Sequence, residues 1–173
     1  GAGFEQYNTG PWLRALQAAG EAADPAVVLA PASPQARDLM PRLAARLGAG
    51  MGTEVTELRL AGGRVVGRRP QYSGKVFSDV SVSSPVAIFT VRPNSFPLPA
   101  SNGAKAEVQA LSVRLTDADM ATRVLEIEAA SSTVADLTEA DRIVSGGRAV
   151  KSKEGFDSVI RLLAEALGAT PGA

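Results

Sequence analysis

The chain has 173 residues, its 18 Lys and Arg residues balance 18 Asp and Glu residues, and it contains neither Cys nor His. This length suits one medium-sized domain, or one domain followed by part of a second. The absence of Cys excludes disulfides, iron–sulfur clusters and a thiol nucleophile, and the absence of His excludes a Ser-His-Asp hydrolase. The balanced charge argues against a nucleic-acid partner, because binding to phosphates requires clustered cations.

The sequence carries no sign of membrane targeting. Residues 1–6 lack the basic and then apolar order of a signal peptide. The longest apolar runs, such as residues 26–32, are far shorter than the roughly 20 residues that span a bilayer. We therefore expect no direct membrane insertion and a location in the bacterial cytoplasm. The opening Gly-Ala-Gly, without a Met, suggests a fragment of a longer protein or an engineered start.

The first fifty residues predict a helix, a strand buried on both faces and a second helix, over residues 11–23, 26–30 and 37–47. Pro11 suits the first position of a helix, and Gly20 is a plausible stop for it. Gly48 is expected to end the second helix, whereas Pro41 is compatible with that helix only within its first turn. Helix, strand and helix in this order indicate an α/β layer.

The middle of the chain predicts a series of strands, over residues 55–60, 64–67, 75–77, 85–91, 107–113 and 123–128. The first two form a hairpin around the glycine turn at residues 61–63. Residues 85–91 are apolar enough for a central strand, and residues 94–103 predict an exposed loop. The fold class is therefore α/β, beginning with an N-terminal sheet domain on which helices pack.

A second unit is expected after the small, hydrophilic residues 129–133, so that the domains cover residues 1–131 and 132–173. It consists of a strand, a glycine turn and an amphipathic helix closed by Gly168, over residues 141–144, 145–148 and 152–167. This order is the first strand-turn-helix unit of a nucleotide-binding α/β domain. The chain stops at Ala173, before a second parallel strand is expected, so we expect this domain to be incomplete.

The glycine turn Ser145-Gly146-Gly147-Arg148 is the first candidate binding site. Glycines after a strand allow a sharp turn and bring backbone N–H groups close to a ligand. Arg148 adds a planar guanidinium that suits a phosphate or an electron-rich ring, and Lys151 and Lys153 keep the local field positive. The glycine spacing is neither the dinucleotide fingerprint nor a P-loop. From these residues alone, a ligand site and a structural turn both remain open.

Three other polar groups are candidate sites. Residues 68–75 contain two arginines, a tyrosine and a glycine, which would clasp an anion or form a solvated turn. Arg92 follows a core strand, where it either pairs across a domain interface or caps the strand end. The acidic pairs are interpreted as solvated faces and not as metal ligands: Asp117 with Asp119, and Glu126 with Glu128. We expect neither a metal site nor catalytic residues.

Four segments in order resemble the alpha subunit of electron transfer flavoproteins: RDLMPRLAARLG (37–48), RPQYSGK (69–75), TVRP (90–93) and SGGRAVKSKEGF (145–156). The resemblance covers nearly the whole chain. It implies a heterodimeric electron carrier, not an enzyme, with an N-terminal α/β domain and a C-terminal FAD-binding domain. The beta subunit commonly holds AMP. Electrons would arrive from soluble dehydrogenases of the acyl-CoA type, as in fatty acid beta-oxidation, and leave to a quinone oxidoreductase.

The resemblance also assigns residues and exposes two departures. Arg148 matches the arginine that contacts FAD, and Gly146 and Gly147 match the turn that admits the cofactor. Ala149 stands where the family usually has a third glycine, so the backbone there must avoid left-handed conformations. The family's first strands and its remaining cofactor segments are missing, so we do not expect this fragment alone to retain FAD. The alternatives are a non-redox module that binds a nucleotide or phosphate, and a scaffold subunit that docks a partner chain.

Overall fold

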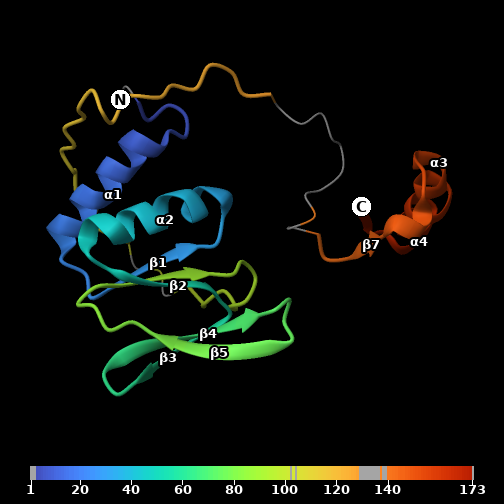
Figure 1. Cartoon of the computed structure of the whole chain (residues 1–173), viewed down its shortest axis with the longest axis horizontal. Helices are drawn as coiled ribbons and strands as arrows, with labels where there is room; N and C mark the ends of the chain where they lie inside the picture. Colours follow the sequence, from blue (N-terminus) through green and yellow to red (C-terminus); the bar gives the residue numbers. More distant parts are fainter. Residues whose placement is uncertain (1–2, 102, 104, 129–136, 138–139, 173) are drawn as a thin grey trace. The chain divides into compact units, whose positions relative to one another are not determined.

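The computed structural model describes residues 3–101, 103, 105–128, 137 and 140–172. They form two compact units, Gly1–Leu125 and Glu126–Ala173, each with its own internal contacts. The predicted domain boundary, between residues 131 and 132, lies outside the described residues. The expectation of a mixed α/β fold is confirmed, because helices, parallel strands and antiparallel strands are all present (Figure 1).

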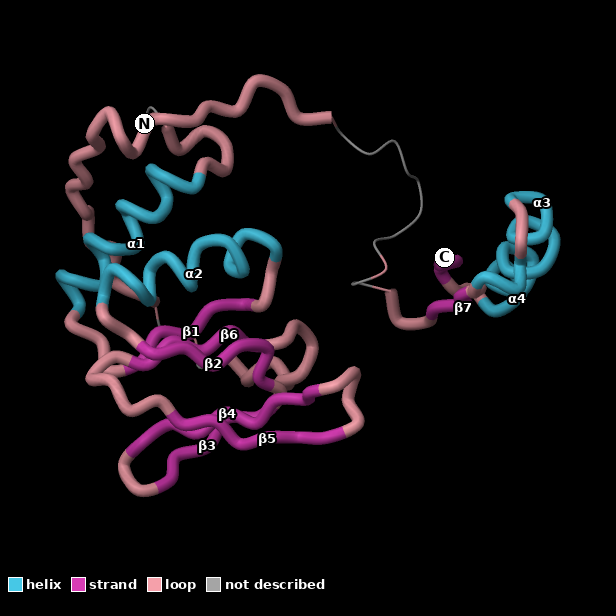
Figure 2. The backbone as a smooth tube through the Cα atoms, in the orientation of Figure 1, coloured by secondary structure: helices cyan, strands magenta, loops and turns pink. Residues whose placement is uncertain are grey.

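The first unit has three layers. Its elements are α1 (Thr9–Ala23), β1 (Val27–Pro31), α2 (Pro34–Leu47), β2 (Gly50–Val55), β3 (Glu57–Ala61), β4 (Arg64–Gln71), β5 (Val76–Ser81) and β6 (Ala87–Val91). Strands β1, β6 and β2 form a parallel sheet in that order, and β3, β4 and β5 form an antiparallel sheet. The helices lie against one face of the parallel sheet, and the antiparallel sheet lies against the other (Figure 2).

The central strand β6 joins two apolar clusters. Ile88 is fully buried on the side of the helices, where it packs with Leu39 and Leu43 of α2. Phe89, also fully buried, packs on the opposite face, between the two sheets. Burial on both faces is what the continuous apolar run of this strand predicts. The parallel sheet is therefore the middle of the core.

Glycines make room for the Phe89 ring. A Cβ on Gly52 would lie 2.6 Å from a ring carbon of Phe89, and a Cβ on Gly67 would lie 2.5 Å from Val55 and 3.0 Å from the ring. Any side chain at these positions would push the two sheets apart. Strand β2, which contains Gly52, escaped sequence analysis because Gly50 and Gly52 weaken its strand pattern.

The helices differ from expectation at their ends. Pro11 is the third residue of α1 and not its first, and α1 passes through Gly20 to end at Ala23 before left-handed Asp24. The prediction of a stop at Gly20 is therefore wrong. Helix α2 begins three residues earlier than predicted, because the Ser33 hydroxyl caps it by accepting from the Ala36 N–H at 3.2 Å. Pro41 lies inside α2 and not in its first turn, so the prediction that it fits only in the first turn is wrong. The helix ends before left-handed Gly48, as predicted.

The strands predicted over residues 107–113 and 123–128 do not form. The described residues from 105 to 128 contain neither helix nor strand (Figure 2). Val108 is 93% exposed, although its position alternates with polar residues as in a half-buried strand. The segment is held on α1 by single contacts, including the hydrogen bond from Asn8 to the Thr122 carbonyl at 2.7 Å. The alternating pattern therefore gave a wrong prediction, because no strand among the described residues pairs with this segment.

The second unit is a small parallel α/β motif. Its elements are β7 (Ile143–Ser145), the 3-10 turn η1 (Arg148–Val150), α3 (Lys153–Gly155), the π-helical stretch η2 (Phe156–Arg161), α4 (Leu162–Leu167) and β8 (Thr170–Gly172). The expectation that no second parallel strand would form is wrong, because β8 pairs with β7 in parallel. Left-handed Gly168 ends the helix as predicted and turns the chain back, so three residues suffice for the pairing.

Candidate functional site

The two glycines after β7 have different surroundings. A Cβ on Gly146 would lie 2.7 Å from side-chain carbons of both Ile160 and Val150, so packing of the helix against the strand requires glycine there. The Gly146 N–H donates to the Gly172 carbonyl at 3.1 Å, which continues the pairing with β8. Gly147 has extended backbone, and nothing described lies within 4 Å of where its Cβ would be. The backbone at Gly147 is therefore open to a ligand.

Arg148 begins η1 directly after these glycines. Its side chain is exposed, and its guanidinium makes no ion pair with any residue that the structure describes. The positive field around it is smaller than the sequence suggests, because Lys153 donates to Asp157 at 2.8 Å. Hydrogen bonds from Lys153 and Arg161 lower the pKa of Asp157 below its ordinary value. Arg148 and Lys151, next to the turn, form no ion pair with a described residue.

The turn leads into the helix through η1, so the helix does not begin at the glycines. It begins at Lys153, where the Ser152 hydroxyl caps it by accepting from the Gly155 N–H at 3.1 Å. Ala149 avoids the left-handed region, as the sequence analysis required, and Lys151 adopts it instead with φ of 61°. Gly155 is the glycine that sequence analysis missed: a Cβ there would lie 2.4 Å from the Val150 carbonyl oxygen.

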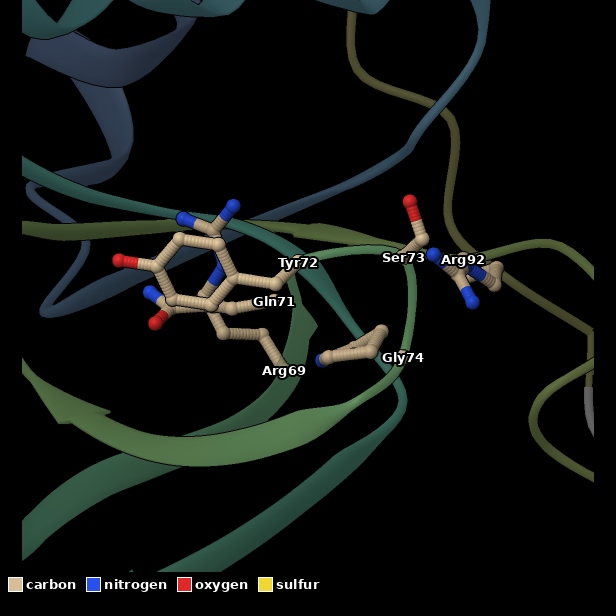
Figure 3. Close-up of a pocket in the computed structure, with 7 residues that line it drawn as sticks. Arg69, Gln71, Tyr72, Ser73, Gly74 and Arg92 are labelled. Atoms are coloured by element: carbon tan, nitrogen blue, oxygen red, sulfur yellow. The ribbon is translucent and has the colours of Figure 1, made fainter.

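A second polar site lies in the first unit, at the tip of the β4–β5 hairpin. We call it the arginine cleft, a hollow of about 510 Å³ lined by Arg69, Pro70, Gln71, Tyr72, Ser73, Gly74 and Arg92. Figure 3 shows Arg69 and Arg92 on opposite sides of the hairpin tip. Tyr72, Ser73 and Gly74 all have left-handed backbone. The structure thus brings together Arg92 and residues 69–74, which are separate groups in the sequence.

Glu54 holds Arg92 in place. It sits at an irregularity of β2 with φ of 56°, and its N–H donates to the buried Thr90 hydroxyl at 3.0 Å. Its carboxylate accepts from Arg92 at 3.2 Å and pairs with Arg37 of α2. Burial alone would raise the pKa of Glu54, but the hydrogen bonds and charges of the two arginines outweigh it and lower that pKa. Arg92 therefore pairs with the neighbouring strand.

One acidic residue is misassigned by sequence. Asp119, expected on a solvated face, is only 4% exposed. It accepts from the Thr116 hydroxyl at 2.7 Å and from Arg14 of α1 at 3.2 Å. The hydrogen bonds from Thr116, ahead of the charge of Arg14, lower the pKa of Asp119. This carboxylate fastens the irregular segment to α1, and a sequence gives no sign of a partner 105 positions away.

The described residues contain no group of three acidic side chains arranged to hold a metal ion. Nor does any helix among them combine the length and the apolar character needed to cross a bilayer.

Two family models match the chain. One, described as the electron transfer flavoprotein domain, matches residues 1–116, and the other, the electron transfer flavoprotein FAD-binding domain, matches residues 136–173. The chain belongs to the electron transfer flavoprotein family. The resemblance stated from sequence is thereby confirmed. The FAD-binding model of this family covers the whole strand-turn-helix unit that carries Gly146, Gly147 and Arg148.

Several relatives of the chain are named alpha subunits of electron transfer flavoproteins. The chain is 36% identical over 98% of its length to the electron transfer flavoprotein subunit alpha of Bacillus subtilis, covering 52% of that protein. It is 33% identical over 98% of its length to the corresponding subunit of Mycobacterium leprae, also covering 52%. A protein named FixB from Clostridium saccharobutylicum is 32% identical over 96% of the chain, which covers 51% of it. The chain thus spans about half the length of these relatives.

Proposed function

We propose that this chain is the alpha-subunit portion of an electron transfer flavoprotein that carries electrons through bound FAD. The observation that carries the proposal is the match of the FAD-binding family model to residues 136–173. This segment holds an open glycine turn followed by Arg148, whose guanidinium pairs with no carboxylate in the part of the chain that the structure describes. When bound, FAD supplies the one- and two-electron redox chemistry, and no bond is made or broken by protein groups. The chain acts as a carrier and not as an enzyme.

The residues of the turn fit an anionic, planar group. Gly147 leaves its backbone uncovered, so a ligand can approach the main chain closely. Arg148 presents a fixed positive charge that no described carboxylate neutralises. A guanidinium near a flavin stabilises negative charge on it, and this stabilisation is stronger where the remaining protein excludes water. Gly146 lets the strand pack on the helix, which fixes the position of the turn.

The partners of the whole protein belong to the same proposal. A subunit called alpha implies a beta subunit, and we propose a heterodimer in which the beta subunit holds AMP. We further propose that electrons come from dehydrogenases of the acyl-CoA type, pass to a quinone oxidoreductase, and do so in the bacterial cytoplasm. The support is the similarity to bacterial alpha subunits. FAD is expected in the assembled heterodimer and not in this segment alone, because the segment spans about half of its relatives.

The test is Arg148→Ala in the heterodimer of the complete alpha subunit with its beta subunit. We expect the variant to lose about tenfold or more in FAD affinity, since a charged hydrogen bond contributes about 1.5–3 kcal/mol. FAD content per heterodimer and the flavin midpoint potential are the measurements. Arg64→Ala, which removes an exposed arginine of β4 in the other unit, is the control and should leave both unchanged.

Two results would contradict the proposal. Unchanged FAD affinity and potential in the Arg148→Ala heterodimer would remove the role of Arg148. A wild-type heterodimer that assembles but shows no flavin absorbance would favour the alternative of a scaffold subunit.

A further inference from the structure

We propose that the arginine cleft of the first unit binds the phosphate group of a small organic phosphate ester. The cleft is formed entirely by residues of β4, the β4–β5 hairpin and the segment after β6. It belongs to a different unit from the glycine turn, so this site does not depend on the proposed FAD function. Four observations carry the inference: charge, an unpaired arginine, position in the sheet, and the size of the hollow.

The charge around the cleft is positive. Its described lining residues include two arginines and no carboxylate. The carboxylate nearest to them in the ion-pair network is Glu54, which pairs with Arg92 and also with Arg37. Arg37, Arg92 and Arg69 carry three positive charges and Glu54 carries one negative charge, which leaves an excess of two positive charges among these four residues. An anion with two negative charges would balance this excess.

Arg69 is the member of this group that lacks a protein partner. Its Nε is buried, and its N–H donates to no hydrogen-bond acceptor among the described residues. The adjacent Arg68, by contrast, lies over the Phe77 ring at 5.1 Å from its centre. Arg59, on the neighbouring strand, pairs with Asp79 at 2.7 Å. A buried polar group without a partner is unfavourable, and a phosphate supplies several acceptor oxygens that suit a guanidinium fork.

The cleft lies where parallel sheets commonly bind ligands. Arg92 follows Val91, the last residue of β6, so it stands at the carboxyl end of the central strand. Ligands of α/β proteins collect at this end of the sheet, where loops replace strands. Tyr72 and Ser73 adopt left-handed backbone, which non-glycine residues seldom do. Such strained residues cluster at ligand sites, and here they form the rim of the cleft.

The size of the hollow favours an ester over free phosphate. A volume of about 510 Å³ is within the range of sites for small organic ligands and exceeds what a bare phosphate fills. The Tyr72 ring on the rim is 77% exposed, so one of its faces is free for stacking. A flat ring attached to the phosphate would gain from this contact. The ligand class is therefore a phosphate monoester with a planar organic part.

The experiment is isothermal titration calorimetry on the 173-residue chain with phenyl phosphate and with inorganic phosphate. We expect one phenyl phosphate per chain and weaker binding of inorganic phosphate. Arg69→Gln should lower the affinity for phenyl phosphate by about tenfold or more. Tyr72→Ala should lower the affinity for phenyl phosphate but not that for inorganic phosphate. Arg69→Lys keeps the positive charge but lacks the paired N–H donors of a guanidinium. Its affinity for phenyl phosphate should lie between those of wild type and Arg69→Gln.

The control is Arg64→Gln on the same strand β4, outside the cleft, and it should bind as wild type does. Circular dichroism of each variant verifies the fold. Equal affinity of Arg69→Gln and wild type, or no binding of phenyl phosphate, would overturn the proposal. The proposal would also be overturned if inorganic phosphate bound as tightly as the ester. It would likewise be overturned if neither phosphate bound but an acidic tetraglutamate peptide did. The FAD content of an Arg69→Gln heterodimer should stay normal, which separates this test from that of Arg148.

Discussion

Replacing Glu54 with Gln tests whether this carboxylate holds Arg92 and α2 together. The side chain pairs with Arg92 and with Arg37, and it is 29% exposed. Gln keeps nearly the same shape and a hydrogen-bond acceptor but removes the charge. Ion pairs of this exposure contribute about 0.2–1 kcal/mol each. We therefore expect Glu54→Gln to lower the free energy of unfolding by about 1 kcal/mol at neutral pH.

The effect of Glu54→Gln should depend on pH in one direction. The folded protein lowers the pKa of Glu54, so folding favours its ionised form. This contribution is complete above the ordinary pKa of Glu, about 4.3, and is lost as the pH falls through the lower pKa of the folded state. The variant lacks the contribution at every pH. The difference between wild type and variant should therefore shrink below about pH 4.3.

Urea unfolding followed by tryptophan fluorescence measures this difference. Trp12 is the single tryptophan and lies in α1, so the signal reports on the first unit alone. Glu57→Gln is the matched control, since Glu57 lies three positions further on, is exposed and makes no ion pair with a described residue. An equal difference between wild type and Glu54→Gln at pH 7 and at pH 3.5 would refute the role of the charge.

Two further substitutions test packing. Phe89→Ala should lower the free energy of unfolding of the first unit by about 3–5 kcal/mol, because loss of the fully buried ring leaves a cavity between the sheets. Leu60→Ala is the control: this residue is 75% exposed, so the same urea experiment should show a change of less than about 0.5 kcal/mol. Gly155→Ala should unfold or loosen the second unit, because its Cβ would meet the Val150 carbonyl oxygen, whereas Gly147→Ala should leave amide hydrogen exchange of that unit unchanged. Similar exchange in both variants would contradict the assigned contact.

Local signals predicted those elements whose stability is local. The Gly48 stop of α2 and the apolar run of β6 were readable because caps and continuous hydrophobicity have direct structural causes. The start of α2 was readable in principle as well, since Ser33 and Pro34 form a standard opening for a helix. The leucine spacing alone indicates a start at residue 37, three residues inside the helix that the cap begins.

Elements that depend on a distant partner were not predictable in this way. Residues 107–113 alternate as a strand does, but a strand also requires a neighbour, and the sequence cannot show that none is present. Asp119 resembles any exposed acid until Arg14 and Thr116 are seen around it. Strand β8 is three residues long and contains Pro171, so only its pairing with β7 identifies it. Each of these three errors concerns a feature that depends on tertiary contacts and not on the local pattern.

The glycine turn shows how structure changes the weight of a motif. Gly146 is required by its contact with Ile160, so its presence would be the same with or without a ligand. Gly147 has no such requirement among the described contacts, and Arg148 has no protein partner among the described residues. A residue that folding does not explain is the better indicator of binding. The FAD proposal therefore depends on Gly147 and Arg148, and Gly147→Ala should reduce FAD retention in the heterodimer while the second unit keeps its fold.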